Sequence, residues 1–163
     1  MNAATTRDAP ELPRIDVQVA ASPSPSRNAL MAWARAALAD DGRRLCIRVV
    51  DENEARELNA RFRDRVESTN VLSFPAQLPD VLGDVAVCAP VVAREAKAQH
   101  KSVDAHFAHM VVHGVLHLRG MDHGTEAQAR EMEAAEIEIL RAFGLDDPYS
   151  AAVENSKPEQ SPV

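Results

Sequence analysis

Cysteine and aromatic residues are both scarce in this chain of 163 residues. Aromatics make up 4% of it, and Cys46 and Cys88 are its two cysteines. They form no Cys-x-x-Cys pair, and each stands in an apolar run typical of a strand, which predicts two buried free thiols in a cytosolic protein. With so few aromatics, the core is expected to consist mostly of aliphatic residues and alanine.

Long apolar runs and a positive net charge are also missing. No apolar run approaches the roughly 18 residues of a membrane span, and no basic region followed by an apolar one predicts a signal peptide. The formal net charge of −7 argues against indiscriminate nucleic-acid binding, although a local basic strip is compatible with it. We therefore expect a cytoplasmic protein that does not associate with membranes.

The length predicts a single domain with polar ends. Residues 1–13 are polar and unpatterned, which predicts a flexible leader, and residues 14–147 carry the apolar patterns of one domain. Residues 148–163 are polar and contain proline, which predicts a disordered tail.

Alternating and short apolar runs predict four strands, and runs of period 3.6 predict the helices between and after them. Their order is β-α-β-α-β-β-α-α-α, which indicates an α+β domain in which a single sheet of about four strands packs with about five helices. The order of the strands within the sheet stays open. The predicted strands are 15–19, 44–50, 71–74 and 84–88.

Three histidines, His113, His117 and His123, lie within eleven residues. Residues four apart share one face of a helix, so His113 and His117 can bind one ion. Gly120 can adopt the left-handed conformation that ends a helix, and the turn after it can bring His123 back to the pair. Three neutral nitrogen ligands leave a position for water, so the pattern predicts one catalytic Zn²⁺ per chain on a central helix. The alternative is a buried face rich in histidine.

His109 offers a rival set of ligands, because it is also four residues from His113. A triad of His109, His113 and His117 would span two turns of one helix, and a single small ion cannot easily be reached from both ends. We therefore expect His109, like His106, to line the cleft beside the metal.

Two further residues bear on the type of metal site. The zinc-protease signature His-Glu-x-x-His has a glutamate as general base, and Gly114 stands in that position here, so a protease would lack its base. Asp122 precedes the third histidine, where it could orient an imidazole or could be a turn residue.

Four arginines, Arg56, Arg61, Arg63 and Arg65, fall within ten residues of an otherwise acidic protein. The guanidinium group suits phosphate, which it can hold with two hydrogen bonds. A solvated helix end would also favour arginine through the helix dipole, and composition alone favours that interpretation.

Together, the histidine and arginine stretches resemble a known family. The sequence His113-Gly-Val-Leu-His117-Leu-x-Gly120-x-Asp122-His123 is similar to the defining motif of the bacterial YbeY family of ribosomal RNA maturation factors. The resemblance covers about Leu58 to Leu145, and Met121 stands where the family usually has tyrosine. The other similar blocks, in the same order, are Leu58-Asn59, Phe62-Arg63-Asp64, Ser68 to Pro75 and Leu82-Gly83-Asp84.

The resemblance implies a single-strand-specific, metal-dependent endoribonuclease that acts in 3′-end maturation of small-subunit (16S) rRNA and in ribosome quality control. Its partners would be ribosomal RNA and the small ribosomal subunit or its assembly factors. It also implies zinc on the three histidines and a functional arginine at Arg63. We expect Arg61 or Arg65 to help bind RNA, and Ser73 is a further candidate for the cleft.

Two other functions stay open: a non-catalytic ribosome assembly factor with a structural zinc site, and a metal-dependent hydrolase of peptides or small molecules. If RNA is the substrate, the arginines should meet the zinc while the acidic charge lies on remote surfaces. The glutamates expected there crowd the last predicted helix: Glu126, Glu131, Glu133, Glu136 and Glu138.

Overall fold

The computed structural model describes residues 14–63 and 69–150. Within these residues the elements follow the order predicted from the sequence. They are β1 (Ile15–Val19), α2 (Arg27–Leu38), β2 (Arg44–Val50), α3 (Glu52–Arg63), β3 (Val71–Pro75), β4 (Val81–Cys88), α4 (Ala89–Ala98), α5 (Val103–Leu118) and α6 (Glu126–Ala142).

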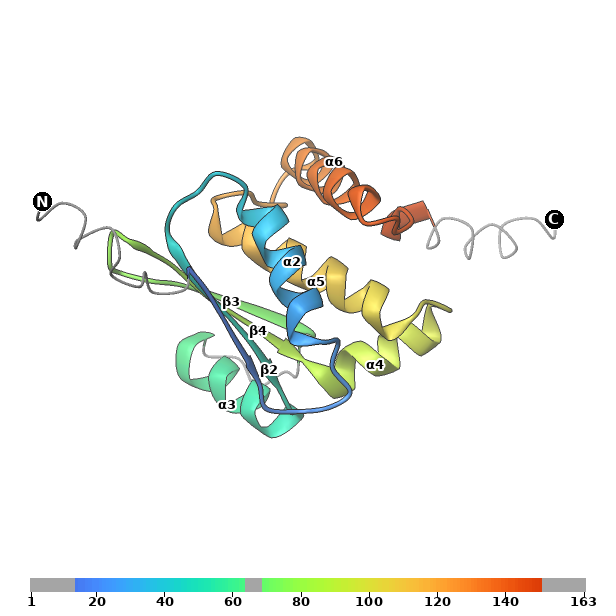
Figure 1. The fold of residues 1–163 in the computed structure, drawn as a ribbon, viewed down its shortest axis with the longest axis horizontal. Coiled ribbons are helices and arrows are strands. Elements are labelled where there is room, and N and C mark those ends of the chain that lie inside the picture. The colour runs from blue at the N-terminus through green and yellow to red at the C-terminus, as the bar shows by residue number, and fades with distance from the viewer. Residues whose placement is uncertain (1–13, 64–68, 151–163) are drawn as a thin grey trace, which may run out of the picture.

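The four strands form one mixed sheet in the order β1-β2-β4-β3. β1, β2 and β4 are parallel, whereas β3 runs antiparallel to β4 and forms one edge of the sheet. Helices α2 and α5 cover one face, α3 covers the other, and α6 lies outside α5 (Figure 1). The predicted α+β class is confirmed, and the strand order is what the sequence left open.

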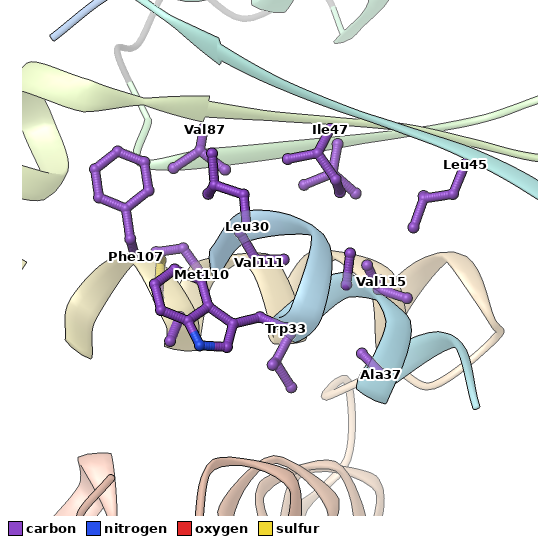
Figure 2. Packing of buried hydrophobic residues seen from close by; sticks show 14 of the residues in the cluster. Leu30, Trp33, Ala37, Leu45, Ile47, Val87, Phe107, Met110, Val111 and Val115 are labelled. Carbon is purple, nitrogen blue, oxygen red and sulfur yellow. The ribbon is translucent and has the colours of Figure 1, made fainter. Parts of the chain in front are cut away.

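The main core fills the space between the sheet and the pair α2 and α5. Figure 2 shows Ile47 and Val87 of the sheet facing Leu30 of α2, with Phe107 and Val111 of α5 beside them. All five side chains are fully buried. A second, smaller cluster lies around Val50, Ala55 and Leu72. Because α5 contacts α2, α4, α6, β3 and β4, it is the central helix of the domain.

Gly114 lets α5 lie unusually close to the sheet. A Cβ atom at this position would be 2.7 Å from Cγ1 of Val85 and 3.3 Å from Oγ of Ser73. The Ser73 hydroxyl donates a hydrogen bond to the carbonyl oxygen of Gly114 at 3.2 Å. The position that holds the glutamate of a His-Glu-x-x-His protease therefore faces the sheet here and has no room for a carboxylate.

The chain still packs against the domain beyond residue 147, the predicted end of the domain. Pro148 is buried, and its carbonyl oxygen accepts a hydrogen bond from Nζ of Lys101 at 3.3 Å. Residues 148–150 form a helical turn, and Tyr149 is half-buried. The assignment of residues 148–150 to the tail was wrong, because proline and polar residues at a chain end do not reveal a docking contact.

The remaining sequence-based expectations concern the thiols and the membrane. Cys46 is half-buried and Cys88 buried, and both are free. Burial is the main cause that raises the pKa of the Cys46 thiol to about 11, so it stays protonated at neutral pH. No helix in residues 14–63 and 69–150 is long and apolar enough to cross a membrane.

Replacing Gly114 by alanine should destabilise the domain. Overpacking against Val85 costs about 1–3 kcal/mol, and the better helix propensity of alanine returns about 1 kcal/mol. We expect a net loss of roughly 1 kcal/mol in the free energy of unfolding, measured with urea. Gly124→Ala is the control, because a Cβ there meets nothing closer than 3.5 Å. A more stable Gly114→Ala protein would contradict the packing account.

Candidate active site

The end of α5 and the turn after it bring three histidines together around one pocket. The rings of His113 and His117 are parallel within 1°, with centroids 6.5 Å apart. The ring of His123 lies 5.6 Å from that of His113 and 6.1 Å from that of His117. These three side chains, with Val71 and Ser73 of β3, line a pocket of about 120 Å³.

The turn that returns His123 to the helix depends on Gly120. Its φ of 102° lies in the left-handed region, as predicted. The backbone N–H of Gly120 donates to the carbonyl of His117 at 3.0 Å, and that of Met121 donates to Leu116 at 3.1 Å. These two bonds close the helix end and direct the chain back towards the pocket.

Asp122 acts in this turn rather than on an imidazole. Its Oδ1 accepts a hydrogen bond from the backbone N–H of His123 at 2.7 Å, and the side chain is exposed. The sequence allowed Asp122 either to orient an imidazole or to be a turn residue, and this contact is that of a turn residue.

A carboxylate does contact the histidine cluster, and it is Glu136 of α6. Its Oε2 lies 2.6 Å from Nδ1 of His113, and its Oε1 lies 3.0 Å from Nε2 of His109 and also accepts from the hydroxyl of Tyr149. Burial raises the pKa of Glu136, but the hydrogen bonds from His109, His113 and Tyr149 outweigh it and lower the pKa to about 2. Glu136 is therefore ionised behind the pocket.

Glu136 was expected on a remote surface with the other glutamates of α6, which was wrong: its side chain is fully buried. It lies between Met132 and Leu140 on the buried stripe of α6, each four residues away. A carboxylate in the middle of an apolar stripe was the available signal, because charged residues are rarely buried without partners.

His106 and His109, which were expected beside the metal, are not among the residues that line the histidine pocket. His109 is turned towards Glu136 and Tyr149. Nε2 of His106 binds Glu95 at 2.8 Å. Burial lowers the pKa of His106. Both residues tie α5 to neighbouring parts of the domain.

The cluster suits a metal of the zinc class by its chemistry. A carboxylate and a carbonyl can only accept, so Nδ1 of His113 donates to Glu136 and Nδ1 of His117 donates to the carbonyl of Met121 at 3.1 Å. In the neutral form of each ring, Nε2 is then the nitrogen without a proton, and this is the form that binds a metal.

The three rings stand slightly wider than a bound zinc ion requires. Imidazoles around one tetrahedral zinc have centroids roughly 5 Å apart. Within residues 14–63 and 69–150, no three His, Cys, Asp or Glu side chains are closed around a common metal position. An inward movement of each ring by on the order of half an ångström would bring the centroids to that spacing.

The arginine predictions are only partly covered by the structure. Arg61 is exposed on α3. Arg63 ends that helix, but its side chain lies outside the described residues, as does all of Arg65. Ser73, also predicted for the cleft, is buried and lines the histidine pocket.

The fold and the pocket define an α+β domain with a three-histidine candidate metal site at the end of its central helix. The family model Endoribonuclease YbeY matches residues 15–144, and the chain belongs to this family.

Curated relatives cover most of the chain. The Endoribonuclease YbeY of Methylococcus capsulatus is 51% identical over 130 residues, which span 77% of this chain and 87% of that protein. That of Hydrogenovibrio crunogenus is 46% identical over 156 residues, spanning 84% and 98%. That of Pseudomonas syringae pv. tomato is 48% identical over 147 residues, spanning 83% and 87%.

The fold is also found in a solved structure. A Thermotoga maritima protein solved in solution matches 90% of this chain and 97% of its own length, with a TM-score of 0.58 and 24% sequence identity. This similarity supports the fold alone.

Replacing Gly120 by valine should destabilise the domain and displace His123. Nothing lies within 4 Å of a Cβ at this position, so the cost of about 1–3 kcal/mol comes from forcing a β-branched residue to positive φ. Urea unfolding and zinc affinity measure the two effects. Gly124→Val, in the same turn region but without positive φ, is the control. Unchanged stability and zinc affinity in Gly120→Val would show that the turn tolerates a side chain.

Proposed function

We propose that this chain is a zinc-dependent endoribonuclease of single-stranded RNA, and that His113, His117 and His123 bind one zinc ion. The observation that carries the proposal is the convergence of these three imidazoles on one pocket in a chain that belongs to an endoribonuclease family. The proposed substrate is the 3′ end of small-subunit rRNA, bound in the cytoplasm with the small subunit or its assembly factors.

The side chains around the pocket prepare it for metal chemistry. When bound, zinc would supply a Lewis acid that polarises a phosphoryl oxygen or lowers the pKa of a water to around 7. His113 and His117 each present Nε2, because Nδ1 is held by Glu136 and by the Met121 carbonyl, respectively. Neutral imidazoles leave the charge of the metal undiminished for a phosphate.

The described lining of the pocket offers no carboxylate as a general base. It consists of Val71, Ser73 and the three histidines. Glu136 contacts His113 from behind the pocket, but its oxygens already accept from His109, His113 and Tyr149. It is therefore unsuited to take a proton from the substrate.

An acidic protein must bind the phosphates of RNA through a local basic strip. Arg61 and Arg63 stand at the end of α3, and eight residues after Arg63 the chain reaches Val71, which lines the histidine pocket. We propose that Arg63 stabilises charge on the phosphoryl oxygens, with Arg61 or Arg65 assisting in RNA binding. Few phosphate contacts imply a shallow dependence of binding on salt.

The first prediction from this proposal concerns the metal. The wild-type protein should bind one Zn²⁺ per chain, and His117→Ala should weaken that binding by well over tenfold, because a ligand is removed. Competition with a chromophoric chelator measures the affinity. His100→Asn is the control, since His100 has a φ of 57°, which asparagine tolerates, and does not line the pocket. Full zinc occupancy in a His113, His117 and His123 triple alanine variant would refute these ligands.

The second prediction concerns Arg63. Arg63→Ala should lower the single-turnover rate of cleavage of a defined RNA by about 100-fold, as expected for loss of a group that stabilises transition-state charge, with little change in RNA affinity. Arg35→Ala is the control, because Arg35 is exposed on α2. If Arg63→Ala weakens RNA binding while the rate at saturating RNA is unchanged, Arg63 is a docking residue instead.

A further inference from the structure

The two helical histidines of the pocket are held by different kinds of acceptor. Nδ1 of His113 donates to the Glu136 carboxylate at 2.6 Å, whereas Nδ1 of His117 donates to the neutral carbonyl of Met121 at 3.1 Å. Hydrogen bonds to an ionised acceptor are shorter and roughly twice as strong as neutral ones. His113 is therefore the more firmly oriented of the two.

The Glu136 carboxylate is itself held from two sides. Its Oε1 accepts from Nε2 of His109 at 3.0 Å, and the Tyr149 hydroxyl donates to the same oxygen. The rings of His109 and Tyr149 meet edge to face, with centroids 5.3 Å apart. α5 and the helical turn at residues 148–150 thus supply the donors, and α6 supplies the acceptor.

Burying the Glu136 carboxylate costs folding free energy, so its presence in the core needs an explanation. Glu136 is 0% exposed, and its neighbours on the buried stripe of α6 are Met132 and Leu140. Burying a carboxylate requires compensating donors, and an apolar side chain of similar volume is often as stable or more stable in such a position. Stability alone does not account for a charged residue there.

We propose that Glu136 is the positioning residue of the metal site, and that Tyr149 and His109 hold its carboxylate in place. The carboxylate keeps the proton of His113 on Nδ1, so that the lone pair of Nε2 faces the pocket, and it strengthens that imidazole as a ligand. Tyr149 follows α6 and does not line the pocket. It then contributes to metal affinity indirectly, through its hydrogen bond to Glu136 and the hydrogen bond between Glu136 and His113. This inference rests on the metal site proposed above.

A purely structural role for Glu136 makes different predictions. If its function were only to join α5, α6 and the turn at 148–150, its replacement would lower the stability of the metal-free protein but leave the zinc affinity of folded molecules unchanged. A positioning role changes zinc affinity and the tautomer of His113. Both quantities are measured on the full chain without reference to RNA cleavage.

The test compares Glu136→Gln, which keeps the volume, with Tyr149→Phe, which removes one donor to the carboxylate. Competition with a chromophoric chelator gives the zinc dissociation constant, and urea unfolding of the metal-free protein checks the fold. We expect zinc binding about 10–100-fold weaker in Glu136→Gln, and a smaller weakening in Tyr149→Phe. Glu138→Gln, an exposed glutamate of the same helix, should bind zinc within twofold of wild type. Zinc affinity within twofold of wild type in a folded Glu136→Gln protein would overturn the proposal.

A second measurement keeps the proposal testable if Glu136→Gln does not fold. Nitrogen-15 NMR of the metal-free wild-type protein should show His113 with its proton on Nδ1, and Tyr149→Phe should reduce the population of that tautomer. His113 with its proton on Nε2 in the wild type would overturn the proposal. Failure of the metal site itself gives a separate result: the wild-type protein would then bind no zinc at these histidines.

Discussion

The close contact between α5 and the sheet at Gly114 is the constraint on which the site depends. Without a side chain at this position, the helix reaches Val85 of β4 and Ser73 of β3. Its histidine edge then lies beside the edge strand β3, whose Val71 and Ser73 complete the pocket. Gly114 also occupies the position of the glutamate base in a zinc protease, and the contact with the sheet leaves no room for a carboxylate there. The helix therefore shares the histidine spacing of a zinc protease but lacks its general base.

Much of the fold and part of the site followed from local signals. The predicted order of elements holds throughout the described residues, because strand alternation and helix period are short-range patterns. The capping box that Thr125 and Gln128 form at the start of α6 is likewise a contact between residues three apart. The positive φ of Gly120 was likewise predictable, since only its own backbone and the helix end determine it.

Long-range contacts were beyond such reasoning. The strand order β1-β2-β4-β3 depends on crossovers that no local pattern specifies. Glu136 was taken for a surface residue because glutamates surround it in sequence, and only the packing of α6 on α5 brings it to His113. The contacts of His109 and Tyr149 could not be predicted for the same reason, because they form with Glu136, which is 27 and 13 residues away, respectively. By contrast, the three expected metal ligands could be proposed from local signals alone: the four-residue spacing on a helix and the turn after it.

One zinc ion at the three-histidine pocket is proposed to be required for RNA cleavage. The most direct measurement removes metal from the folded protein with a chelator and follows cleavage of a defined single-stranded RNA while Zn²⁺ is added back. We expect no cleavage by the metal-free protein and a linear recovery of cleavage that ends at one zinc ion per chain. Cleavage that persists in the folded, metal-free protein, or that zinc fails to restore, would contradict it.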